Sequence, residues 1–444
     1  MPASVSVIEI SYIILSLIFL FLFKTQKGGW AESLYVVLVI TSPYSISIIP
    51  FRQDAIDFYG IYDNTRVLNV LNFYKIYGLS ILDCFSIFIL AKNVKLITNK
   101  MPFFFIIIYY IVVIFSLISY SISSLVIWSE ELDDYHRFLS VFKSLVYILS
   151  LYCCFIKLGQ RMGLDQLCQL LCLIIIIYFF SNAVFLSFLP QWYTWIKYGF
   201  NYKFLDQTDQ FLVFLVLAIS FFGPLKSRWL YMVGALFLAG LIIISGGKAF
   251  VYTLFILAIS YFIMKNWISL RQSIILFMSG IVFSWVVTLW IGSSMLDLSI
   301  YTRYFQVEQL VLNYINYPVL SLFGIGANKA YYFFSEQLVF DPGAYFSEEL
   351  ETNFRLGFQT PYLLWLKNYG MFGLLIVAMS LLLLANEENK NKVVSKAFFV
   401  ALSFYFILIV IFDYPSFGIK TFIPVALYMY IFKLNREHES ESVF

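Results

Sequence analysis

Apolar stretches of about 20 residues follow one another along almost the whole chain, and short polar connectors separate them. A helix needs about 20 largely apolar residues to cross the hydrocarbon core of a bilayer. Hydrophobic residues make up 61% of the sequence and charged residues 12%, whereas soluble domains hold roughly 45–50% and about 25%. An ordinary water-soluble fold is therefore excluded, and we expect an all-α fold, a polytopic integral membrane helix bundle.

The apolar stretches predict about thirteen transmembrane helices. They cover residues 5–23, 31–50, 67–90, 103–125, 138–156, 167–189, 209–223, 230–245, 249–264, 273–291, 361–385, 397–412 and 421–434. The first stretch lacks the basic start and cleavage site of a signal peptide, so we interpret it as a retained span. The chain then divides into a bundle of about ten spans (1–291), a large external loop (292–360), and C-terminal spans with a short tail (361–444).

Basic residues in the connectors predict the orientation of the bundle, because short cytoplasmic loops are enriched in Lys and Arg. Sixteen of the 29 Lys and Arg residues fall in short connectors on one side. They are Lys24, Lys27, Lys92, Lys95, Lys100, Lys157, Arg161, Lys226, Arg228, Lys265, Arg271, Lys390, Lys392, Lys396, Lys433 and Arg436. This places the long loop and the N-terminus outside, and the C-terminus in the cytoplasm.

The long loop contains helical patterning of its own, which is typical of a loop that carries function. Apolar side chains recur at i, i+3, i+4 and i+7 within 301–317, and Pro318 ends the pattern. They are Val307, Leu310, Val311 and Tyr314. We also expect a second helical piece over 327–339. An acidic cluster follows, which is either a solvated face or a source of a proton-accepting carboxylate. Its members are Glu348, Glu349 and Glu351.

Three lysines, Lys75, Lys143 and Lys367, lie inside predicted spans near their external ends. A lysine at the centre of a membrane helix costs roughly 2.5–3.5 kcal/mol on insertion scales, so it marks a partner or a pathway, unless it snorkels to the headgroups. Three lysines at the same depth favour an outward-facing cavity with positive potential. Asp83 follows Lys75 in the same predicted helix and is a candidate counter-charge.

Ser245-Gly246-Gly247-Lys248 joins two predicted spans at the external surface. Glycines let backbone N–H groups approach a ligand closely and the lysine adds charge, a combination that suits a phosphate. A tight turn between two helices also requires glycine. Both interpretations stay open, and the spacing is not that of a P-loop.

The positions of the cysteines and the net charge narrow the class of protein further. All five cysteines fall inside apolar segments, so neither a disulfide framework nor a metal cluster is expected. They are Cys84, Cys153, Cys154, Cys168 and Cys172. The net charge of +3 is too small and too dispersed to indicate a nucleic-acid partner. We expect membrane lipids as the surroundings of the chain, and no cofactor.

The order of these motifs resembles the O-antigen polymerase and ligase superfamily, the integral membrane enzymes that build bacterial surface polysaccharide. Asp206-Gln-Thr-Asp-Gln210 is similar to the polar start of a family helix, and Ser245-Gly-Gly-Lys248 to its serine-plus-basic pattern. Arg303 followed by Leu322-Phe-Gly-Ile-Gly326 resembles the start of the family's large periplasmic loop. Gln359-Thr-Pro-Tyr362, leading to Gly373, is similar to the motif that enters the next helix.

The resemblance implies a multi-pass protein of the bacterial inner (cytoplasmic) membrane with its N-terminus in the periplasm. Its substrate would be an oligosaccharide repeat unit on undecaprenyl pyrophosphate, and a chain-length regulator protein is a candidate partner. The reaction would move a growing glycan from its lipid carrier to an incoming lipid-linked unit, without a metal. Cations would stabilise the charge that grows on the departing pyrophosphate, and a held hydroxyl would attack.

Candidate residues follow from that chemistry. Arg303, Arg355 and Lys248 are the candidates for the departing pyrophosphate, with arginine favoured for its bidentate fit to phosphate oxygens. Glu349, Glu351 and His136 are candidates for accepting a proton. Candidate substrate-binding residues are Lys75, Lys143, Lys367, Gln359 and Tyr362.

Two alternatives remain open. One is a ligase that transfers finished glycan to lipid A core; the ligase branch of the family carries a histidine where this chain has Gln359. The other is a flippase for lipid-linked oligosaccharides. Transporters often contain inverted repeats, and this sequence shows no convincing internal repeat.

Overall fold

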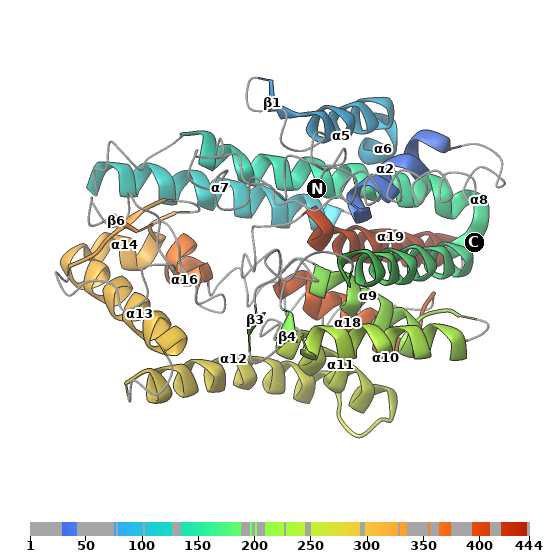
Figure 1. The fold of residues 1–444 in the computed structure, drawn as a ribbon. Coiled ribbons are helices and arrows are strands. Elements are labelled where there is room, and N and C mark those ends of the chain that lie inside the picture. The colour runs from blue at the N-terminus through green and yellow to red at the C-terminus, as the bar shows by residue number, and fades with distance from the viewer. Residues whose placement is uncertain are drawn as a thin grey trace, which may run out of the picture.

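The computed structural model describes most of the helical part of the chain (Figure 1). The described residues are 29–41, 75–76, 79–100, 103–126, 135–187, 196–197, 200–201, 209–225, 228–244, 250–293, 298–326, 329–334, 354–355, 364–373, 393–408 and 419–441. Within them the fold is almost entirely helical, as the composition predicts. Three short antiparallel hairpins are the exceptions.

Polar connectors divide the described chain into successive helices. These are α2 (Trp30–Thr41), α5 (Ile81–Lys92), α6 (Val94–Lys100), α7 (Phe103–Val126), α8 (Tyr135–Ser187), α9 (Asp209–Phe222), α10 (Trp229–Ile244), α11 (Phe250–Met264), α12 (Leu270–Ser293), α13 (Leu298–Asn316), α14 (Pro318–Phe323), α16 (Leu364–Tyr369), α18 (Lys396–Phe406), the 3₁₀ turn η6 (Ile419–Thr421) and α19 (Phe422–Glu441). The hairpins pair β1 (Lys75–Ile76) with β2 (Leu79–Ser80), β3 (Ile196–Lys197) with β4 (Phe200–Asn201), and β5 (Tyr331–Tyr332) with β6 (Phe354–Arg355).

Most predicted spans within the described residues correspond to helices with closely similar bounds, because apolar runs and helices end at the same polar connectors. The predicted span 67–90 is partly wrong. Its described part begins with the β1–β2 hairpin, in which Lys75 pairs with Ser80, and helix α5 starts only at Ile81. Ser80 and Asp83 form a capping box there, so the helix start is fixed by side chains that the apolar pattern does not register. The predicted span 5–23 lies outside the described residues.

Helix α8 combines two predicted spans, 138–156 and 167–189, in one element that breaks at Gly163. Gly163 has a φ of 82°, a left-handed conformation that glycine adopts without strain. Figure 1 shows the helix turning back on itself there, at the right of the view, so its two arms run side by side. Each arm is longer than the ~20 residues that a span requires.

One segment of the described chain, Lys143–Phe180 in α8, is long and apolar enough to cross a membrane by length and composition. Shorter apolar helices of 10–17 residues accompany it. The all-α class is therefore established by the structure, whereas thirteen membrane crossings remain a prediction.

The main hydrophobic core surrounds α8, which packs against α2, α5, α9 and α19. Aromatic rings fill much of this core. Phe214 of α9 stacks on Tyr405 of α18 with ring centroids 4.7 Å apart, and Phe277 of α12 stacks on Phe404 at the same separation. These contacts join helices that are distant in the sequence into one bundle.

A second, smaller hydrophobic cluster lies at the left of Figure 1, around the helices that the sequence assigned to the long loop. We call α13, α14, β5, β6 and α16, together with the described residues that adjoin them, the loop unit. Helix α16 belongs to the predicted span 361–385 rather than to the predicted loop, and it ends before Gly370, which has a positive φ. Its buried residues include Phe305, Leu310 and Leu320, and Ile122 and Val126 of α7 pack against them. The loop unit is thus a packed structure with a core of its own, seated on the end of α7.

The opposite end of the bundle carries the described basic connectors, and we call it the basic end (Figure 1). Glu32 of α2 forms ion pairs with Lys92 of α5 and Lys157 of α8. Ser395, before α18, donates to the carbonyl of Phe222 in α9 at 2.6 Å. Connectors that the sequence assigned to one side therefore meet at one end, and the loop unit lies at the other.

Candidate functional site

Helix α13 organises the loop unit through a stripe of amide side chains. Its Asn313 donates to the carbonyl of Tyr332 at 2.6 Å and accepts from the N–H of Tyr332 at 3.1 Å. Gln309 accepts from the N–H of Phe334 at 2.8 Å. The extended segment that contains β5 therefore runs along α13. Its backbone N–H and C=O groups bond to side-chain amides of α13, whereas in a helix they would bond to one another.

These bonds explain two departures from the sequence-based expectations. The helical piece expected over 327–339 is wrong in its described part, because Tyr331 and Tyr332 form strand β5. The helix expected at 301–317 is confirmed as α13, but Val311, expected on its apolar face, is exposed. The buried face instead includes the polar Gln309 and Asn313, which hydropathy cannot assign to a core.

Strand β6 brings Arg355 into this cluster. Arg355 pairs with Tyr331 across the hairpin and is only 2% exposed. Its guanidinium lies 4.7 Å from the ring centroid of Phe333, within the range of a cation–π interaction. Phe333 in turn packs edge-on against Phe305 of α13, with centroids 5.0 Å apart.

Arg303 lies on α13 two residues before Phe305, so the helix joins it to the same unit. The side chain is partly buried. Its Nε is buried and has no hydrogen-bond partner among the described residues. A buried donor of this kind costs about 1–3 kcal/mol when unsatisfied, so an acceptor from a ligand would stabilise it.

Lys329 is a basic residue of the site that sequence reasoning missed. It is buried, donates to Ser124 Oγ at 2.9 Å, and lies 5.0 Å from the centroid of Tyr120. Both partners belong to α7, so Lys329 attaches the loop unit to the bundle. Its signal in the sequence was its place shortly after the Gly324-Ile-Gly326 motif.

Lys367 of α16 falls in the same unit and is buried. Its carbonyl accepts from the N–H of Ile325 at 2.6 Å, which ties α16 to the glycine turn after α14. Tyr314 of α13 donates to the neighbouring carbonyl of Leu366. Burial raises the pKa of Tyr314, so this phenol remains a neutral donor.

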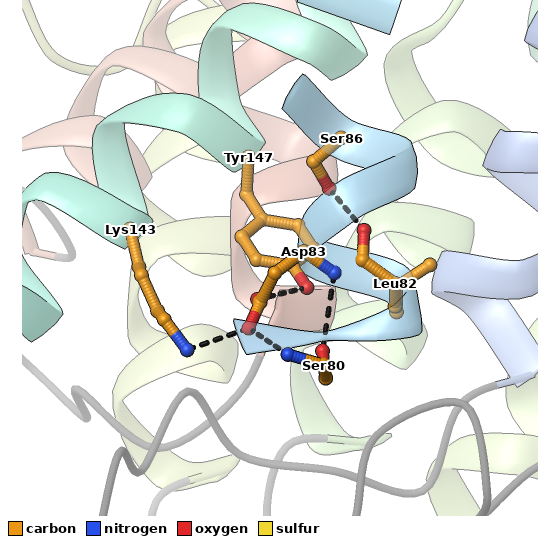
Figure 2. A network of polar contacts seen from close by, with 6 residues as sticks. All are labelled: Ser80, Leu82, Asp83, Ser86, Lys143 and Tyr147. Carbon is orange, nitrogen blue, oxygen red and sulfur yellow. Dashed lines mark hydrogen bonds and ion pairs between the residues drawn. The ribbon is translucent and has the colours of Figure 1, made fainter. Parts of the chain in front are cut away.

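The structure places Lys143 in a different network, between α5 and α8 (Figure 2). Its Nζ lies 2.6 Å from Asp83 Oδ2, and Tyr147 donates to Oδ1 of the same carboxylate at 2.8 Å. Asp83 is thus a counter-charge of Lys143. Lys75 belongs to β1, and its side chain lies outside the described part of the chain.

The other predicted site residues are not placed. Lys248, Glu349, Glu351, Gln359 and Tyr362 lie outside the described residues. His136 belongs to the first turn of α8, and its side chain is likewise outside the described part of the chain.

The described part of the loop unit is strongly positive. It contains four basic side chains, those of Arg303, Lys329, Arg355 and Lys367, and one carboxylate, Glu308, which is exposed. One guanidinium against an aromatic ring, a second with an unsatisfied Nε, and two buried ammonium groups in the same unit suit a multiply charged phosphate ligand.

Comparison of the chain with protein-family models, with curated proteins and with solved structures gives no match. Function is therefore inferred from the geometry of the loop unit and from the sequence motifs.

Proposed function

We propose that this protein is a bacterial membrane polymerase, which joins oligosaccharide repeat units carried on undecaprenyl pyrophosphate at the periplasmic face of the inner membrane. The observation that carries the proposal is the excess of basic side chains in the described part of the loop unit, at the end of the bundle opposite the described basic connectors. Because the loop unit lies at one end of the bundle, its basic side chains would interact with a diphosphate at one face of the membrane.

The exposed surface supports a membrane location. Large apolar side chains are exposed along α10, α11 and α12, including Phe237, Phe262 and Phe283. Trp267 before α12 and Trp290 near its end are also exposed, and tryptophan is enriched at both membrane interfaces. The 24 residues of α12 span about 36 Å at ~1.5 Å per residue, which fits a hydrocarbon core of ~30 Å.

The distribution of charge supports the orientation. The basic end matches the cytoplasmic enrichment in Lys and Arg, which leaves the loop unit on the periplasmic side. A lipid-linked substrate in the outer leaflet would then present its diphosphate at the level of Arg303 and Arg355.

The reaction that suits these groups is glycosyl transfer. The acceptor hydroxyl oxygen attacks the anomeric carbon of the donor glycan, and the bond from that carbon to the diphosphate oxygen breaks. The electron pair stays on the departing diphosphate, and the hydroxyl proton passes to solvent or to a nearby carboxylate. Arg303 and Arg355 stabilise the growing negative charge through charge-assisted hydrogen bonds. Lys329 and Lys367 add to the positive potential from their buried positions.

The test compares Arg303→Ala with Arg228→Ala, an exposed arginine at the basic end. Arg303→Ala should abolish long polymer while lipid-linked single units and protein abundance stay normal, and Arg228→Ala should leave chain length unchanged. Normal chain length in Arg303→Ala would remove Arg303 from the mechanism. A deletion strain that accumulates finished polymer on its carrier would identify a ligase instead.

A further inference from the structure

A buried carboxylate at the basic end gathers cations from two other helices. Glu32, in the first turn of α2, is 1% exposed. Its Oε1 lies 3.1 Å from Lys92 Nζ of α5 and 3.0 Å from Lys157 Nζ of α8. Both ammonium groups share a single oxygen, so they are held side by side.

A third cation joins the same place. The guanidinium of Arg161, one turn after Lys157, occupies the space where a Cβ on Gly29 would stand, and Glu32 Oε2 lies 3.8 Å from that point. Glu32 therefore pairs with two lysines, and the Arg161 guanidinium lies near this group on the side of Gly29. Among these four side chains the basic groups outnumber the carboxylate three to one. The next acidic residue along α8, Asp165, comes after the chain reversal at Gly163.

The excess charge is accessible. The side chains of Lys92 and Lys157 are 41% and 26% exposed, and Arg161 is exposed as well. Trp30, which begins α2 two residues before Glu32, is 67% exposed. A positively charged group beside an exposed tryptophan is typical of the membrane–water interface, where the ring lies among headgroups.

We infer that Glu32, Lys92, Lys157 and Arg161 form a binding site for the phosphate headgroup of an anionic phospholipid in the cytoplasmic leaflet. This inference rests on the proposed membrane location and orientation. Basic pockets between helices on the cytoplasmic side bind anionic headgroups. Glu32 orders two flexible lysines before the lipid arrives, which reduces the entropy lost on binding.

The experiment uses the purified full-length protein in neutral detergent, titrated with phosphatidylglycerol or phosphatidylcholine, and counts bound lipid by native mass spectrometry. The wild type should retain more phosphatidylglycerol than phosphatidylcholine. Arg161→Gln should weaken that retention about fivefold, because each basic residue near an anionic surface contributes about 1 kcal/mol. Lys92→Gln should do the same, and both variants keep the Lys157–Glu32 pair.

Arg271→Gln, in the first turn of α12 at the basic end, is the matched control and should retain lipid as the wild type does. Equal retention by Arg161→Gln and Arg271→Gln, or no preference of the wild type for phosphatidylglycerol, would overturn the inference. Inorganic phosphate at millimolar concentration should not displace the lipid; if it does, the site binds free phosphate instead. A normal polymer in Arg303→Ala cells would count against the proposed function and not against the lipid preference measured in detergent, whereas a protein absent from the membrane fraction would count against both proposals.

Discussion

Gly324 and Gly370 make close backbone contact within the loop unit, and no other residue type fits at either position. Gly324 has a φ of 80°, and a Cβ built on it would stand 2.5 Å from the backbone of Asn368 and Tyr369. Gly370 has a φ of 57°, and its Cβ would stand 2.5 Å from Gly324 N. Both the conformation and the space therefore require glycine.

Gly324→Ala should destabilise the loop unit by about 1–3 kcal/mol, because strained backbone and a collision with backbone atoms act together. The measurement is limited proteolysis of the loop unit in the purified protein. Gly240→Ala is the control, since a Cβ at Gly240 in α10 meets nothing within 4 Å, and alanine is the better helix former. Equal cleavage rates in the two variants would contradict the prediction.

The Asp83 network yields a second prediction at the scale of single residues. Asp83→Asn removes the counter-charge of Lys143, and breaking a buried ion pair typically costs about 3–5 kcal/mol. The double variant Asp83→Asn/Lys143→Met removes both charges and should recover much of the lost stability. Thermal unfolding in detergent measures the stability of the single and the double variant. A double variant as unstable as the single one would show that the charge pair is not the source of the loss.

At the scale of elements, the stripe of amides on α13 holds β5 in place. Asn313→Ala removes both hydrogen bonds to Tyr332 and should destabilise the local structure by about 1–3 kcal/mol. Hydrogen exchange at the Tyr332 amide should accelerate accordingly. The control is Asn316→Ala on the same helix, whose exposed side chain donates to the carbonyl of Leu312 within α13. We expect its Tyr332 amide to exchange as in the wild type.

The helices could be predicted from the sequence wherever an apolar run ends at polar residues. Helices α7, α9, α10 and α11 begin and end within about two residues of the predicted bounds. The hairpin at Lys75 and the strand at Tyr331 could not be predicted, because their strands are only two residues long and too short to leave a pattern in the sequence. The strand at Tyr331 also depends on a distant partner, Arg355, and on the side-chain amide of Asn313. The break at Gly163 depends on one positive φ.

Part of the candidate site could also be predicted from the sequence. Arg303 and Arg355 were identified by charge and by their place in the loop, and both lie in one packed unit. Lys329 was missed because nothing in its local sequence indicates that it reaches Ser124 and Tyr120 of α7. Lys143 was grouped with the site by its depth in the bundle, a criterion that does not reveal its pairing with Asp83.

At the scale of the whole molecule, the two ends differ in charge and in construction. The basic end consists of helix ends joined by ion pairs and by bonds such as that from the Val393 N–H to Asn435 Oδ1. The other end carries the loop unit, whose core is separate from that of the bundle. For a chain that lies in a membrane as proposed, this asymmetry predicts that the basic end faces the cytoplasm, because basic connectors are retained there.

The orientation can be tested with single cysteines at the two ends. Cys84 is exposed and the other four native cysteines are buried, so a Cys84→Ser background should give little labelling. Asn316→Cys on α13 and Lys265→Cys after α11 both introduce a thiol at an exposed position. In sealed spheroplasts a membrane-impermeant maleimide should label Asn316→Cys and spare Lys265→Cys, and after lysis both should react. Labelling of Lys265→Cys in sealed cells would reverse the topology and would place Arg303 and Arg355 out of reach of a diphosphate in the outer leaflet.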